Sequence, residues 1–215
     1  MIDFQNVLDE IHAKLLEEVN RGVVASYIPE LSNIDAKHFG MHLKHIDGRS
    51  FSTGDYSKGF SIQSISKVLT LAMALPLYSE DIWKRIEVEP SGNPFNHLSL
   101  LELEHGIPRN PLINAGAIVV ADVLVSKLKN PKQEFLQYVR NLANDQTINY
   151  NYKVAESERL TGFNNFAAAN LLKAYQNLEN NVDDVLDFYF HQCSIEMTCE
   201  QLSNAFFMFA NHGIC

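Results

Sequence analysis

The chain has 215 residues, of which 46% are hydrophobic and 20% are charged, a composition typical of a soluble globular protein. Seventeen Lys and Arg residues against 26 Asp and Glu residues give a formal net charge of −9, without a long run of either sign. Phosphate binding needs clustered Lys and Arg side chains, so this distribution argues against a protein that binds nucleic acid.

The remaining bulk features point to a cytoplasmic protein. The longest strongly apolar segment, residues 68–77, contains Pro76 and is shorter than the roughly 20 apolar residues that cross a bilayer, so no membrane partner is expected. The first residues lack the basic flank and apolar core of a secretory signal. Cys193, Cys199 and Cys215 have no paired metal spacing, which favours reduced thiols over a zinc site or a disulfide framework.

The N-terminal third contains three predicted elements. Apolar residues recur at helical spacing over 4–19, which predicts an amphipathic helix. Alternating apolar residues around Asp47-Gly48 predict a β-hairpin over 39–55 with a tight turn. Apolar side chains then cover every face of the segment 65–75, which is typical of a helix at the centre of a domain, and Pro76 is expected to kink or end it.

The rest of the chain is predicted to consist of helices and loops. Pro and Gly residues predict loops at 89–94 and 106–111. Thr198 and Gln201 predict a capping box for the last helix, and Gly213 predicts its stop. The helical periodicity lies at residues 115–128, 132–142, 165–178, 183–192 and 199–210.

No linker is long enough to divide the chain into independent domains. We therefore expect a single domain over residues 1–215. Within it, residues 1–60 would form the N-terminal helix plus the β-hairpin, and residues 61–215 would form a helical region.

The run Ser64-Ile65-Ser66-Lys67 places a hydroxyl and an amine three residues apart at the start of the predicted buried helix. Residues at this spacing share a helix face. A serine needs a neighbour that takes its proton, and a lysine can do so only where burial or nearby positive charge lowers its pKa. The run therefore indicates Ser64 as a nucleophile and Lys67 as its base.

The same spacing occurs a second time, in Ser126-Lys127-Leu128-Lys129. That run lies near the end of a predicted helix beside other lysines and Asn130-Pro131, so its lysine, Lys129, is expected to stay solvated and charged. For Ser64 the motif alone leaves a second interpretation open: a helix-capping serine followed by a lysine whose amine reaches the solvent.

The surrounding segment, Phe-Ser-Ile-Gln-Ser-Ile-Ser-Lys-Val-Leu over residues 60–69, resembles the nucleophile segment of the serine-dependent glutaminases. Those enzymes are related in fold to the serine β-lactamases and penicillin-binding proteins. Other blocks look like that family's blocks in the same order, namely Tyr27-Ile28-Pro29-Glu30-Leu31, Asp47-Gly48, Gly54-Asp55, residues 90–96, residues 110–117, Ser157-Glu158-Arg159 and residues 187–190.

The resemblance covers essentially the whole chain and implies a fold. It implies an α+β, mostly helical chain with the β-lactamase/transpeptidase-like glutaminase fold. A helical subdomain would accompany only the N-terminal strands of the central sheet. The resemblance also implies that the protein forms a homo-oligomer.

The resemblance implies roles for individual residues. Ser64 and Lys67 would be catalytic, and Glu158 would hold the α-ammonium group of the substrate through charge-assisted hydrogen bonds. Asn114 would hold the same end of the substrate. The implied substrate-binding residues are Tyr27, Ser64, Asn114, Glu158, Asn165 and Tyr189.

Each of these residues also has an ordinary structural interpretation. Asn114 is placed to cap the helix predicted from residue 115, and Asn165 is placed to cap the next helix. Glu158 could be a solvated surface carboxylate, as most glutamates are. Tyr189 stands between two phenylalanines and could belong to the core with its hydroxyl at the edge.

The implied activity is the hydrolysis of L-glutamine to L-glutamate and ammonia. Ser64 would attack the side-chain carboxamide, and Lys67 or a partner tyrosine would accept its proton. Ammonia would leave once its nitrogen is protonated, and water would then cleave the γ-glutamyl ester of Ser64. Backbone donors would stabilise the tetrahedral intermediates. No metal and no organic cofactor is needed, and the histidines show no ligand spacing.

The sequence departs from the family pattern at its end. Related glutaminases continue beyond the point that matches Cys215 with a segment that carries another active-site tyrosine and a Lys-Ser-Gly-type strand. Neither Lys-Ser-Gly nor Lys-Thr-Gly occurs here. We therefore expect a C-terminally incomplete domain and little or no activity from the 215-residue polypeptide alone.

Two other hypotheses remain open at this point. The chain could be a truncated or degenerate relative that acts as a binding module without turnover. It could also be another Ser-x-x-Lys acyl-serine hydrolase, acting on β-lactams or peptides.

Overall fold

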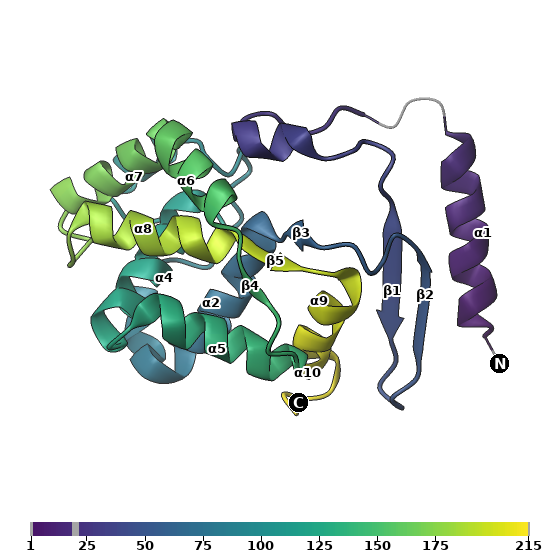
Figure 1. The fold of residues 1–215 in the computed structure, drawn as a ribbon. Helices are drawn as coiled ribbons and strands as arrows, with labels where there is room; N and C mark the ends of the chain where they lie inside the picture. The colour runs from purple at the N-terminus through teal and green to yellow at the C-terminus, as the bar shows by residue number, and fades with distance from the viewer. Residues whose placement is uncertain (1, 19–21, 215) are drawn as a thin grey trace.

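The structure, a computed structural model, describes residues 2–18 and 22–214 (Figure 1). Its helices are α1 Phe4–Glu17, α2 Ser66–Tyr78, α3 Ser99–Leu103, α4 Asn114–Lys127, α5 Pro131–Ala143, α6 Tyr152–Thr161, α7 Phe163–Ala174, α8 Val182–Cys193, α9 Cys199–Ala205 and α10 Phe207–Ala210. Its strands are β1 Gly40–Lys44, β2 Ser50–Gly54, β3 Phe60–Ser61, β4 Asn149–Tyr150 and β5 Ile195–Met197. Short 3₁₀ turns are η1 Pro29–Asn33, η2 Gln63–Ile65 and η3 Ser79–Lys84.

The hairpin β1–β2 forms one side of the molecule. The strands pair antiparallel with Gly40 opposite Gly54 and Lys44 opposite Ser50, which confirms the hairpin predicted over 39–55. Gly48 closes its turn with a φ of 91°, a conformation that glycine adopts without the Cβ clash of other residues. Helix α1 packs on β2 and α9 packs on β1, so the hairpin lies between these two helices (Figure 1).

Helix α1 begins where the sequence predicts. The carboxylate of Asp3 accepts the backbone N–H of Asn6 at 3.1 Å and so caps the first turn. The apolar face meets the hairpin, since the ring of Phe4 lies 5.5 Å from that of Phe51, measured between centroids. The helix ends at Glu17, and the predicted last residue, Val19, lies outside the described residues.

A second sheet lies inside the region that was predicted to be helical. Its strand order is β3-β5-β4 and both pairings are antiparallel. The region predicted to be helical, 61–215, therefore also contains short strands that the sequence did not predict. These strands are two or three residues long, too short for alternation to appear in a sequence. Strand β3 leads directly into the segment that contains Ser64, and β5 follows the end of α8.

Helix α4 forms the centre of the helical body. Residues 115–124 of α4 are all buried, and the helix packs against α2, α7 and α8. A helix that is buried on all faces can be apolar all round. The sequence predicted such burial for α2, but the structure shows it more completely in α4. Pro76 lies within α2, which continues to Tyr78, so Pro76 lies in its last turn and marks its approximate end.

Other predicted helices differ at their ends. Helix α7 covers 163–174 rather than 165–178, and the helix predicted over 199–210 is divided at Phe206 into α9 and α10. The capping box is confirmed, because the Gln201 N–H donates to Thr198 Oγ1 at 3.1 Å and the Thr198 N–H to Gln201 Oε1 at 2.9 Å. Helix α6 was not predicted. Within the described residues, no helix has the length and apolarity needed to cross a bilayer.

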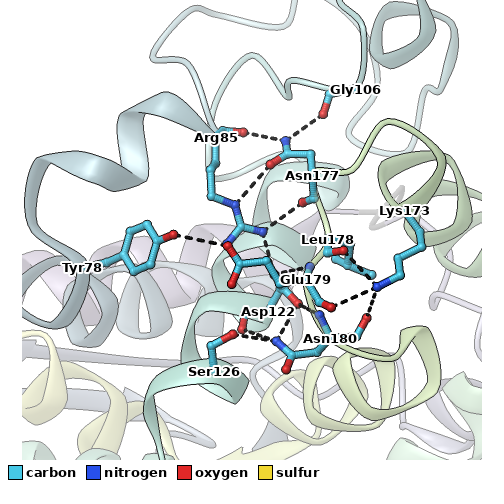
Figure 2. Close-up of polar contacts among 10 residues, drawn as sticks. All are labelled: Tyr78, Arg85, Gly106, Asp122, Ser126, Lys173, Asn177, Leu178, Glu179 and Asn180. Carbon is cyan, nitrogen blue, oxygen red and sulfur yellow. Dashed lines mark hydrogen bonds and ion pairs between the residues drawn. The ribbon is translucent and has the colours of Figure 1, made fainter.

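A buried polar cluster ties α4 to the loop between α7 and α8 and to the end of η3 (Figure 2). Arg85 Nη2 donates to Asp122 Oδ2 at 2.6 Å. Asp122 is 0% exposed and also accepts the backbone N–H groups of Glu179 and Asn180 at 3.0 and 2.9 Å. Both carboxylate oxygens of Asp122 are therefore paired.

Candidate active site

A cavity of about 340 Å³ lies between α6, α7, α8 and the turn η2. All six residues predicted to bind substrate line it, although they come from positions between 27 and 189. Its lining residues are Tyr27, Ile28, Gln63, Ser64, Asn96, Asn114, Glu158, Thr161, Gly162, Phe163, Asn164, Asn165, Tyr189 and Cys193. A larger cavity of about 720 Å³ next to β4 and β5 contains none of the predicted residues, so the chemistry of the lining, and not size, selects the candidate site.

Ser64 lies in the turn η2, two residues before α2 begins at Ser66. The prediction placed it at the start of the helix itself. The residue before it, Gln63, has a φ of 47°, a left-handed conformation that costs a non-glycine residue roughly 1–2 kcal/mol. Ser64 is exposed and opens on the cavity.

Lys67 lies in the first turn of α2 and is 2% exposed. Its Nζ donates to Asn114 Oδ1 at 2.7 Å and to the carbonyl of Leu112 at 3.0 Å. Burial lowers the pKa of Lys67, and the nearby Cys193 and Glu158 oppose that shift. The interpretation of Lys67 as a solvent-reaching lysine is therefore wrong, and the described residues show its amine bonded to Asn114 rather than to Ser64.

Asn114 is the first residue of α4, and the preceding Ile113 is the N-cap. Its side chain accepts from Lys67 and donates from Nδ2 to Asn165 Oδ1 at 3.0 Å. The cap of α7 is Gly162, not Asn165. Both capping interpretations are therefore wrong, because the two amides bond to each other beside the cavity.

Glu158 lies in α6 and is 7% exposed, so its interpretation as a surface carboxylate is wrong. Burial raises the pKa of Glu158 to about 8, and the positive charge of Lys67 opposes the shift. Among the described residues, no group hydrogen-bonds to its buried Oε2. Glu158 is therefore largely protonated near neutral pH in the ligand-free protein, and a cationic ligand that enters the cavity would favour its ionised form and bind to it.

The two tyrosines that line the cavity differ in exposure. Tyr189 on α8 is 2% exposed, and burial raises the pKa of its hydroxyl well above the ordinary value. Tyr27 is 71% exposed and lies at the mouth. The turn η1 holds the Tyr27 segment against α6, because the Glu30 N–H donates to Ser157 Oγ at 3.2 Å.

Eight of the fourteen lining residues were given no individual role by the sequence, among them Cys193, Asn96 and Gln63. Cys193 follows Tyr189 by four residues on α8, so the spacing along a helix face would have revealed it. Asn96 lies in a block that resembles the family but was given no role. Gln63 gave no signal, because a positive φ at glutamine cannot be read from a sequence.

Ser126, the serine of the second Ser-x-x-Lys run, lies in the last turn of α4 and does not line the cavity. Its Oγ accepts from Asn180 Nδ2 at 2.7 Å, and Lys129, the lysine of this run, is exposed. The second Ser-x-x-Lys run therefore lies outside the candidate cavity, in agreement with its interpretation as a chance match. Within the described ranges, no group of three or more His, Cys, Asp or Glu side chains could hold a metal ion.

Comparison with known proteins decides the family. A sequence model of the glutaminase family matches residues 22–215. The chain belongs to the glutaminase family. It is 53% identical over 212 residues to a glutaminase of Christiangramia forsetii and 49% identical over 213 residues to one of Saccharophagus degradans. The alignments cover 99% of this chain and 70% and 69% of those relatives.

Solved glutaminase structures share the fold. A structure described as the probable glutaminase ybaS superposes with a TM-score of 0.90 at 32% identity, covering 98% of this chain and 68% of that one. A probable glutaminase of Bacillus subtilis superposes with a TM-score of 0.81 at 28% identity, covering 96% and 65%. The expected β-lactamase-like glutaminase fold with a partial sheet is confirmed, and the chain is a member of a family of amidohydrolases that convert glutamine to glutamate and ammonia.

Proposed function

We propose that the cavity between α6, α7 and α8 binds L-glutamine and that Ser64 attacks its side-chain carboxamide. The observation that carries this proposal is a buried carboxylate, Glu158, with an oxygen that lacks a partner among the described residues, in the same cavity as an exposed serine. L-Glutamine offers its α-ammonium group to Glu158 and its side-chain carboxamide to Ser64.

Depth within the cavity supports one orientation of the substrate. Glu158, Asn165 and Tyr189 are 7%, 8% and 2% exposed, whereas Ser64 is exposed. The α-ammonium group therefore binds at the buried end, next to Glu158, and the side chain of glutamine points toward Ser64. Asn114 and Asn165, already bonded to each other, hold the α-amino and α-carboxylate end.

The chemistry follows from these positions. Ser64 Oγ forms a bond to the carboxamide carbon while its proton passes to a base, and backbone N–H groups stabilise the tetrahedral intermediate. The C–N bond breaks as the nitrogen is protonated, which releases ammonia and leaves a γ-glutamyl ester on Ser64. Water then hydrolyses the ester. We propose Lys67 as the base, since its lowered pKa makes the neutral amine more available at neutral pH.

Several broader properties are also proposed. The steps proposed above use a serine hydroxyl, a lysine amine and backbone N–H groups, so we propose that no cofactor and no metal takes part. The unpaired thiols of Cys193 and Cys199 fit a reducing compartment, which supports a cytoplasmic location. We propose a homo-oligomer by analogy with the family, and a single domain in which residues 1–60 and 61–215 act together. Low activity of the 215-residue polypeptide stays a prediction.

Covalent labelling tests the proposal. The purified chain is treated with a diazoketone analogue of glutamine, which alkylates an activated nucleophile in a glutamine site, and the modified peptide is identified by mass spectrometry. We expect one adduct, on Ser64, and none after treatment with penicillin. Ser64→Ala should abolish the adduct, whereas Ser126→Ala, which removes the matched serine of the second Ser-x-x-Lys run, should leave it unchanged.

Two outcomes would overturn the proposal. An adduct at any other residue would mean that Ser64 is not the nucleophile. A folded chain that binds glutamine in calorimetry but forms no adduct would instead support the binding-module hypothesis.

A further inference from the structure

A set of side-chain hydrogen bonds holds the turn that presents Ser64. Gln63 Nε2 donates to Ser61 Oγ at 2.7 Å, and Ser61 Oγ donates in turn to the carbonyl of Cys193 at 2.9 Å. Ser61 is the last residue of β3, and Cys193 is the last residue of α8. The serine hydroxyl thus links the residue before the nucleophile to the helix that carries Tyr189.

The conformation of Gln63 explains why such a link is useful. Its φ of 47° is unfavourable for a side chain with a Cβ, and a free glutamine would leave it for an ordinary helical or extended conformation. The carbonyl of Gln63 is held from the other side, because Ser66 Oγ donates to it at 2.7 Å and the Ser66 N–H donates to it as well. Ser61 and Ser66 therefore hold the side chain and the carbonyl of the same strained residue.

The backbone on the N-terminal side of the turn is fixed independently. Ser61 pairs with Glu196 in the sheet, and the Ile62 N–H donates to the carbonyl of Ile195 at 2.9 Å. Rotation about the bonds of Gln63 is then the main freedom left to the turn before α2 begins. A change of φ at Gln63 would carry Ser64, the next residue, away from the cavity.

We propose that Ser61 is a positioning residue for Ser64: its hydroxyl accepts from Gln63 and donates to Cys193, and this keeps Gln63 in the left-handed conformation that presents Ser64 to the cavity. The inference rests on the proposed role of Ser64. Ser61 does not line the cavity, so it acts on the reaction only through the turn.

A simpler role must be separated from this one. Ser61 could merely satisfy a carbonyl at the end of α8, as capping groups do. Ser194 provides a matched control, because its Oγ donates to the carbonyl of His191, also in the last turn of α8, at 2.9 Å. Among the described residues, Ser194 makes no hydrogen bond to the turn that contains Gln63. Ser194→Ala therefore removes a comparable hydrogen bond without touching Gln63.

The test compares rates of Ser64 labelling by the diazoketone analogue at saturating reagent. Misplacement of a reacting group by about 1 Å can cost on the order of 100-fold, so we expect Ser61→Ala to slow labelling by at least about 10-fold with little change in the half-saturating concentration. Ser61→Thr, which keeps the hydroxyl, should retain the wild-type rate. Ser194→Ala should lower the unfolding temperature without slowing labelling.

A suppressor variant sharpens the result. Asparagine adopts positive φ more readily than other residues with a Cβ, so Ser61→Ala combined with Gln63→Asn should label faster than Ser61→Ala alone. Labelling of Ser61→Ala within about twofold of the wild type would overturn the inference.

If the wild type itself is not labelled, the proposed function fails and the inference is decided by crystal structures. A positive φ at Gln63 and an unmoved Ser64 in Ser61→Ala would then overturn it, whereas a φ that has turned negative would support it.

Discussion

Two buried polar regions of this molecule contrast in how their charges are satisfied. In the cluster around Asp122, the carboxylate is 0% exposed and bonds to Arg85, to two backbone N–H groups and to Asn180 (Figure 2). In the cavity, Glu158 is 7% exposed, its Oε2 has no partner among the described residues, and burial raises its pKa to about 8.

This difference in hydrogen bonding indicates a structural role for the Asp122 cluster and a ligand-binding role for the cavity. A buried ion pair with every lone pair satisfied holds secondary structure in place, and removing one partner leaves the other charge stranded. A buried carboxylate with an unpaired oxygen lowers stability and persists where a ligand completes its bonding. The cluster around Asp122 is complete without a ligand, and the cavity is not.

The largest expected effect is the loss of stability when the fully hydrogen-bonded carboxylate of Asp122 is removed. Asp122→Ala leaves the guanidinium of Arg85, whose side chain is 11% exposed, with only the more exposed carboxylate of Glu179 at 3.4 Å, so the free energy of unfolding should fall by about 3–5 kcal/mol. Urea unfolding measures it, with Glu158→Gln as the matched variant in the cavity, expected to be neutral or stabilising. A loss at Glu158 as large as that at Asp122 would break the comparison.

The next effect in size is expected on the rate of Ser64 labelling when the amine of Lys67 is removed. Lys67→Met keeps an unbranched buried side chain but removes the proposed base, so labelling of Ser64 by the diazoketone analogue should slow by at least about 100-fold. Circular dichroism serves as the control for folding. A folded variant that is labelled at the wild-type rate would show that another group accepts the proton.

The pH dependence of stability gives a smaller effect with a defined sign. Between the ordinary pKa of 4.5 and the folded value of about 8, folded Glu158 keeps a proton that the unfolded chain releases. Raising the pH through this window therefore lowers the free energy of unfolding, by at most about 1.4 kcal/mol per pH unit. The wild type should lose stability relative to Glu158→Gln as the pH rises. Parallel pH profiles of the two proteins would contradict the assigned state of Glu158.

Much of the fold could be predicted from periodicity and turn chemistry. The hairpin was predicted because Asp47-Gly48 marks a tight turn, and the capping box because Thr198 and Gln201 have the required spacing. The strands β3, β4 and β5 could not be predicted, since pairing between segments far apart in the chain defines strands of two or three residues. Helix α6 was missed because its sequence is polar and only a few of its residues, including Glu158, are buried.

For the site, in contrast to the fold, local sequence patterns were a poor guide. Its residues were predicted from the resemblance to a family, whereas local patterns favoured the wrong interpretation at several positions. Asn114 has the sequence context of a helix cap, but tertiary packing turns its amide toward Lys67 and Asn165. The unpaired oxygen of Glu158 and the strained φ of Gln63 depend on distant neighbours and cannot be read from adjacent residues.

The central claim is that Glu158 binds the α-ammonium group of glutamine at the buried end of the cavity. Calorimetric titration of Ser64→Ala with L-glutamine and with 4-carbamoylbutanoate, the same molecule without the amino group, tests it directly. We expect glutamine to bind about 10- to 100-fold more tightly, and the addition of Glu158→Gln to reduce that ratio to about one. An unchanged ratio in the double variant, or no preference for glutamine in Ser64→Ala, would contradict the account.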